Sequence, residues 1–127
     1  MKLIPESFSF RDYFENSLIP MWIYNPADLI ILDCNNAALE FYGYSRSELI
    51  GKPIADMRPD EDRMRFFAHM ATANMNENYT SRRWRHRKKS GEVVYVDIHS
   101  QRLTTVDGGP PRRGSAARRR RRGWWAG

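Results

Sequence analysis

The chain has 127 residues, of which 41% are hydrophobic and 13% aromatic, and its formal net charge is +6 at pH 7. This is the size of a single domain with a modest core. No apolar run approaches the roughly 18 residues that a membrane-spanning helix needs. The single cysteine, Cys34, excludes an internal disulfide and a four-cysteine zinc site. These features predict a soluble, cytoplasmic domain without a membrane span.

The positive charge is confined to the C-terminal end of the chain. Residues 1–106 contain 14 Lys and Arg against 14 Asp and Glu, whereas residues 107–127 contain seven Arg and one Asp. The body of the protein is therefore neutral. An argument from basicity to nucleic acid binding would rest on this tail alone.

The first part of the chain predicts a helix and a hairpin. Residues 7–18 carry apolar side chains three, four and eight positions after Phe10, a spacing typical of a helix. Pro20 ends that helix. Residues 21–24 and 29–32 are short β-branched and aromatic runs joined by polar residues, which is the pattern of a β-hairpin.

A cluster of short helices is expected next. Asp33, Asn35 and Asn36 each offer an N-cap side chain for the first of them, and Gly43 stands where a left-handed residue would end it. Ser45 and Glu48 form a capping box for the second helix. The third and longest helix begins at residues 59–62, whose acidic side chains suit the helix dipole. Its predicted apolar face consists of Met64, Phe67, Ala68, Ala71 and Met75.

The end of the chain divides into a hairpin and a tail. Residues 79–103 predict a long β-hairpin, because they are rich in aromatic and β-branched residues around a Ser-Gly turn. Residues 107–127 contain no Val, Ile, Leu, Phe or Met, so they bury too little apolar surface to offset the entropy of ordering. We therefore predict one folded domain over residues 1–106 and a disordered basic tail over 107–127.

Three stretches resemble a known family. They are FENSLIPMWIYNP (residues 14–26), LIILDCNNAALEFYGYSRSELIGKPIADMRPDED (29–62) and WRHRKKSGEVVYVDIHSQRL (84–103). With them, residues 13–103 resemble a PAS domain of bacterial sensory proteins such as histidine kinases and diguanylate cyclases. The resemblance implies an α+β fold, in which a PAS-like antiparallel sheet carries short helices on one face.

The tail departs from the pattern of this family. A fifth, apolar strand is expected in the middle of the sheet, between the first and fourth strands. Pro110 and Pro111 occupy this part of the sequence, and proline cannot donate to a β-ladder. We therefore expect the final central strand to be missing and the protein to be marginally stable. Our hypothesis is that the reading frame is lost shortly after Asp107.

The resemblance also implies a function. Such modules sense a small molecule, redox state or light, or they act as dimerisation and relay elements in signal transduction, including two-component systems. We expect a non-catalytic sensory and interaction module that relays a ligand, redox or partner signal to an effector domain outside these 127 residues. Its expected partners are a second copy, as a homodimer, or that effector domain. No Ser/His/Asp set or P-loop indicates an enzyme.

Five residues are candidates for sensing or relay: Trp22, Asn35, Tyr42, His69 and Trp84. His69 is also a weak cofactor candidate, because imidazole can ligate haem iron. The haem ligand of the family would fall about one turn earlier, near Phe66. Flavin-binding members carry a G-x-N-C-R-F-L-Q phrase that this sequence lacks. We therefore expect no haem, flavin or metal.

The alternative function is that of a basic nucleic-acid-binding protein acting through its tail. Five consecutive arginines at residues 118–122 would neutralise phosphates, and Trp124 and Trp125 could stack on bases. No motif for base readout accompanies them, so we expect no specific nucleic acid. Removal of residues 107–127 distinguishes the two functions, because only the alternative depends on them.

Overall fold

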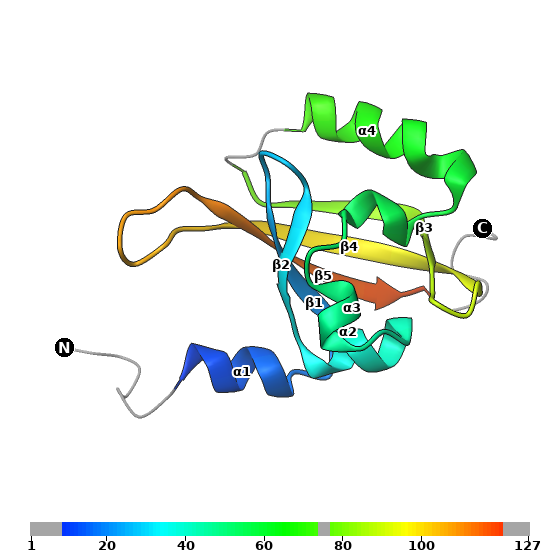
Figure 1. Cartoon of the computed structure of the whole chain (residues 1–127). Coiled ribbons are helices and arrows are strands. Elements are labelled where there is room, and N and C mark those ends of the chain that lie inside the picture. Colours follow the sequence, from blue (N-terminus) through cyan, green and yellow to red (C-terminus); the bar gives the residue numbers. More distant parts are fainter. Residues whose placement is uncertain (1–8, 74–76, 121–127) are drawn as a thin grey trace.

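The protein is built on one sheet of five antiparallel strands (Figure 1). The computed structural model describes residues 9–73 and 77–120. The strands lie in the order β2-β1-β5-β4-β3. They are β1 (Met21–Asn25), β2 (Ile30–Cys34), β3 (Tyr79–Arg87), β4 (Val93–Leu103) and β5 (Arg112–Arg119). The predicted α+β class and both predicted hairpins are confirmed.

The predicted absence of the last strand is wrong. Strand β5 lies between β1 and β4, with Ala116 opposite Met21 of β1 and Ala117 opposite Ile98 of β4. Pro110 and Pro111 come just before the strand, where they break no hydrogen bond of the ladder. Of the predicted tail, residues 112–119 thus form a central strand, and residues 121–127 lie outside the described residues.

Strand β5 occupies a central position in the sheet although it has no large apolar side chain. Arg113, Ser115 and Ala117 alternate toward the interior and are buried. Gly114 lies on the opposite face, where a Cβ atom would come within 3.2 Å of the Leu103 side chain. Small residues suffice here because the neighbouring strands supply the apolar side chains of the core. The requirement for an apolar strand was therefore too strict.

The helices are α1 (Phe10–Asn16), α2 (Asn36–Tyr42), α3 (Arg46–Leu49) and α4 (Arg63–Thr72), with 3₁₀ turns η1 (Ile54–Met57) and η2 (Asp60–Asp62). Several predicted caps are confirmed. The Asn35 side chain accepts a hydrogen bond from the Ala38 amide at the start of α2, and Gly43 ends that helix with a φ of 82°. Ser45 and Glu48 form the complete capping box of α3. Helix α1 is shorter than the predicted 7–18, and Ser9 caps it.

Helix α4 presents a different face to the core from the one predicted. Phe66 is buried and Met70 is half-buried, whereas Met64 is 85% exposed. The rotation of the helix is fixed at its start, where Asp62 accepts two hydrogen bonds from Arg85 of β3, at 2.9 and 2.7 Å. This ion pair turns Phe66 and Met70 toward the sheet. The apolar residues that we assigned to the buried face include solvent-exposed ones, and Met75 lies outside the described residues.

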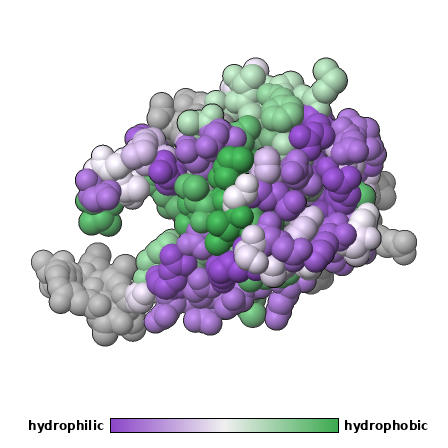
Figure 2. Space-filling view, viewed as in Figure 1, coloured by the Kyte–Doolittle hydropathy of each residue, from purple (hydrophilic) through white to green (hydrophobic). Residues whose placement is uncertain are grey.

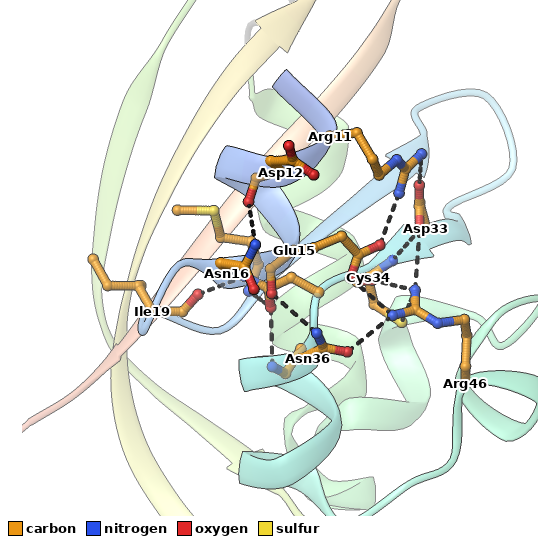
Figure 3. A network of polar contacts seen from close by, with 12 residues as sticks. Arg11, Asp12, Glu15, Asn16, Ile19, Asp33, Cys34, Asn36 and Arg46 are labelled. Carbon is orange, nitrogen blue, oxygen red and sulfur yellow. Dashed lines mark hydrogen bonds and ion pairs between the residues drawn. The ribbon is translucent and has the colours of Figure 1, made fainter. Parts of the chain in front are cut away.

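A network of charges ties α1 to β2 and α3 (Figure 3). The Arg46 guanidinium donates to the carboxylate of Glu15 at 3.0 Å and to the carbonyl oxygen of Cys34. Arg11 pairs with Asp33 at 2.8 Å. Single exposed ion pairs contribute little to stability. Because Arg46 joins groups of α1 and β2 at once, it sets the position of the N-terminal helix.

The central position of β5 predicts the effect of truncation. A chain that ends at Pro111 lacks the strand that pairs with both β1 and β4. We expect it to lose cooperative thermal unfolding, followed by circular dichroism, because two strand edges and the core beneath β5 become exposed. A chain that ends at Arg120 keeps β5 and serves as the matched control. Cooperative unfolding of the shorter chain at the temperature of the control would contradict this assignment of β5.

Candidate functional site

A small cavity lies between the sheet and α4. Its volume is about 20 Å³, which is room for about one water molecule. Strands β1, β3, β4 and β5, the turn η1 and helix α4 all contribute to its walls. The rings that line it include Trp22, Phe66, His69, Tyr79 and Trp84. Aromatic side chains from both layers of the fold therefore line the cavity.

Arg58 brings a buried positive charge to this cavity. The residue follows η1 and is 4% exposed. Its guanidinium carbon lies 4.0 Å from the ring centroid of Phe66 and 5.3 Å from that of Trp84, in cation–π contact with both. Its Nη1 donates to the Ile54 carbonyl oxygen at 2.9 Å, and its Nε is buried without a partner. Burial lowers the pKa of Arg58 to about 10, so the group is charged at neutral pH.

A second polar cluster lies beside the cavity. The Tyr42 hydroxyl and His86 Nδ1 form a buried hydrogen bond of 2.6 Å. The Trp22 ring centroid lies 5.5 Å from that of Tyr42 and 5.6 Å from that of His86. Trp22 Nε1 and His86 Nε2 are buried and have no hydrogen-bond partner within residues 9–73 and 77–120. Burial and the nearby charge of Arg58 lower the pKa of His86 well below its ordinary value, so the imidazole is neutral.

Arg113 of β5 is a buried cation of a different kind. Its Nε and Nη2 donate to Ser100 Oγ at 3.2 and 2.9 Å, and its Nη1 donates to the Glu77 carbonyl oxygen at 2.8 Å. The guanidinium carbon lies 5.0 Å from the ring centroid of Tyr79. Neutral oxygen acceptors therefore satisfy the donors of Arg113, whereas Arg58 keeps a buried N–H without an acceptor.

A wider groove lies on the other face of the sheet, beside α1. It has a volume of about 510 Å³, and its walls include Phe10 and Tyr13 of α1 together with Met21, Ile23 and Leu103 of the sheet. Met21 and Ile23 alternate with the buried Trp22 and Tyr24, so they lie on the face opposite the core. Figure 2 shows apolar side chains gathered in the hollow between α1 and the β4–β5 connection.

The comparisons with known proteins decide the family. The sequence model described as "PAS domain" matches residues 19–112. The chain belongs to the PAS domain family. No curated protein matches it. The strand order and the core between the sheet and helices α2, α3 and α4 are consistent with this membership.

Solved structures of other PAS domains share this fold. The chain is 21% identical to the PAS domain of an HTR-like protein from Haloarcula marismortui, with a TM-score of 0.70 and coverage of 84% of each chain. It is 17% identical to a PAS domain from Colwellia psychrerythraea, with a TM-score of 0.72 and coverage of 86% of this chain and 92% of that one. A PAS domain from a two-component sensor histidine kinase is 19% identical, with a TM-score of 0.64 and coverage of 86% and 91%.

The PAS fold brings four of the five predicted candidates together. Trp22, His69 and Trp84 line the cavity. The ring of Tyr42 contacts that of Trp22 in an edge-type arrangement. Asn35 lies away from the cavity. Its Oδ1 accepts from the amides of Met21 and Ala38, and its Nδ2 donates to the Ile19 carbonyl oxygen. Asn35 therefore joins the start of α2 to the chain segment between α1 and β1.

Three important residues were not among the predicted candidates. Arg58 contributes the buried charge, and the ring of Phe66 stacks on it. His86 contributes the buried imidazole. Arg58 lies in a short turn with no periodic pattern, so no helix or strand rule indicated its burial. His86 could have been found, because it shares the inward face of a strand with Trp84, two residues earlier.

The cavity does not fit a large cofactor in this packing. Ligand pockets for molecules of that size have volumes of about 300–1,000 Å³, against about 20 Å³ here. Phe66 stands near the position expected for a haem ligand and packs on Arg58 instead.

Within residues 9–73 and 77–120, no group of three or more His, Cys, Asp or Glu is placed to hold a metal ion. In the same part of the chain, no helix is long and apolar enough to cross a membrane.

The buried imidazole of His86 predicts a pH dependence of stability. Its pKa in the folded domain is lowered from the ordinary 6.5, so below that pH the unfolded chain binds a proton that the folded domain does not. The free energy of unfolding is therefore unaffected by this group above pH 6.5. Below pH 6.5 it decreases as the pH falls, by up to about 1.4 kcal/mol for each pH unit. Urea unfolding between pH 7.5 and 5.5 measures this slope.

The variant His86→Gln should be less stable at pH 7.5 but should lose most of this slope. His69→Gln is the matched control. The pKa of His69 is also lowered, by burial first and by Arg58 and Arg65 second, but the residue is only half-buried, so the control should keep most of the slope. An equal slope in wild type and His86→Gln would contradict a neutral buried His86.

Proposed function

We propose that this PAS domain is a non-catalytic, cytoplasmic sensory and interaction module, which relays a ligand, redox or partner signal to an effector domain. The observation that supports it most directly is this cavity, because Arg58 and Trp22, which line it, carry the buried donors Nε and Nε1 without acceptors among the described residues. Unsatisfied buried donors cost stability. They are expected where a protein keeps a site for a ligand rather than filling it with its own groups.

The contacts around Trp22 suggest how such a signal leaves the cavity. Trp22 follows Met21, whose amide donates to Asn35 Oδ1 at 2.9 Å. The amide group of Asn35 in turn donates to the Ile19 carbonyl oxygen at 2.9 Å, three residues beyond the end of α1. A change in packing at Trp22 therefore acts on α1 through Asn35. The ligand would shift the population of α1 positions rather than drive a chemical step.

We further propose that the module works as a homodimer, with a second copy of the chain in the groove beside α1. Phe10 and Tyr13 of α1 are 62% and 72% exposed, and the facing wall of the groove combines apolar residues of the sheet, such as Met21 and Ile23, with polar ones. A two-fold axis would place the aromatic face of each α1 in the groove of the other copy, which makes the surface self-complementary. Dimerisation would then couple the position of α1 to the neighbouring subunit.

We propose that no haem or flavin takes part. The support is the small volume of the cavity and the packing of Arg58 on Phe66 in its wall. Nucleic acid binding through the tail has less support as the main function. Arg113 faces the interior and Arg120 lies 3.4 Å from Asp97, so these two arginines are engaged within the domain.

The relay predicts that a change at Trp22 alters α1. We expect Trp22→Phe to speed hydrogen–deuterium exchange of the α1 amides by about two- to thirtyfold, which corresponds to a coupling of about 0.5–2 kcal/mol. The effect should disappear in an Asn35→Ser background, because serine still caps α2 but lacks the amide donor to Ile19. Ile31→Val, a buried change away from the cavity, is the control. Equal exchange of α1 in all of these proteins would refute the relay.

The dimer predicts a specific effect of charge on α1. Wild-type protein should sediment as a dimer at micromolar concentration, and Tyr13→Lys should shift it to monomer, because the charge would be buried against the apolar groove. Met64→Lys places the same charge on the exposed face of α4 and should leave the dimer intact. A monomeric wild type, or dissociation by Met64→Lys alone, would rule out this interface.

A further inference from the structure

Arg58 is a buried cation without a counter-ion. Among the described residues, no carboxylate forms an ion pair with its guanidinium group, which donates a hydrogen bond to the Ile54 carbonyl oxygen. The nearby carboxylate of Asp62 forms its two hydrogen bonds with Arg85, and it acts on Arg58 only through the electrostatic field, without an ion pair. Burial of an ion without a partner is strongly unfavourable. The aromatic rings of Phe66 and Trp84 offset only part of this cost.

Two side chains that line the cavity carry buried N–H groups without an acceptor. Within the described part of the chain, Arg58 Nε and Trp22 Nε1 are inaccessible to solvent and have no hydrogen-bond partner. Neither group can accept a hydrogen bond, because a guanidinium and an indole N–H are donors only. An occupant that satisfies both must therefore be an acceptor. A cavity of about 20 Å³ limits that occupant to about the size of one water molecule.

The charge of Arg58 itself favours an anion over water. Arg58 is 4% exposed and is charged at neutral pH, and no carboxylate of the described residues forms an ion pair with it. Water would supply an acceptor but no negative charge, whereas an anion supplies both.

We propose that this cavity binds a small inorganic anion of halide size, which accepts hydrogen bonds from Arg58 Nε and Trp22 Nε1. The proposal names the ligand class of the sensing site and so rests on the function proposed above. The anion would neutralise Arg58, which joins η1 to α4, and would contact Trp22, from which the route to α1 begins. Anion binding would thus hold the sheet, η1 and α4 in one packing.

The test is a chloride titration of the full chain at constant sodium concentration, with gluconate as the replacing anion because it is too large for the cavity. At ten times the dissociation constant, chloride should lower the unfolding equilibrium constant about elevenfold. Arg58→Met should abolish this dependence. Arg65→Met is the matched control, because Arg65 stacks on the same Trp84 ring but does not line the cavity, and it should keep the dependence.

A measurement on the wild type alone covers the case in which Arg58→Met does not fold. Line broadening of the chloride-35 NMR signal by folded protein should be reversed by bromide, which competes for the site, and not by gluconate. An equal chloride response in wild type and Arg58→Met, or its loss in Arg65→Met as well, would overturn the proposal. If chloride has no effect while Trp22→Phe still changes exchange in α1, the ligand class is wrong and the relay function stands.

Discussion

The stacking of Arg58 on Phe66 and Trp84 joins the layers of this domain. Arg58 follows η1, Phe66 belongs to α4 and Trp84 to β3, so one side chain connects η1 and α4 to the sheet. The ion pair between Asp62 and Arg85 fixes the rotation of α4 that makes the contact possible. The interior thus depends on a charged group in a place that an ordinary core would give to an aliphatic residue.

The two buried arginines have different roles: Arg113 stabilises the sheet, and Arg58 belongs to the proposed ligand site. Arg113 has oxygen acceptors in Ser100 and in the Glu77 carbonyl, and it allows the Arg-rich β5 to occupy the centre of the sheet. Arg58 keeps a buried N–H without an acceptor beside a cavity. A site that is incompletely satisfied in its resting state can gain free energy from a ligand, and this gain is what a sensory module needs in order to change its packing.

The sequence predicted those features that depend on local signals. The caps at Asn35, Gly43 and Ser45, and both hairpins, follow from a few neighbouring residues and are present. Strand β5 was missed because its stability comes from partners far away in sequence, β1 and β4. The prediction of the buried face of α4 was wrong because an ion pair with a residue distant in sequence, Arg85, sets the rotation of the helix. Arg58 was missed because a charged residue in an irregular turn gives no pattern that indicates burial.

The most direct test of the anion site is diffraction from crystals grown or soaked in bromide, measured at the bromine absorption edge. The account predicts an anomalous peak within hydrogen-bond distance of Arg58 Nε and Trp22 Nε1, and no such peak in crystals of Arg58→Met. Ordered water in this cavity at high bromide, with anomalous peaks confined to the surface arginines, would contradict it.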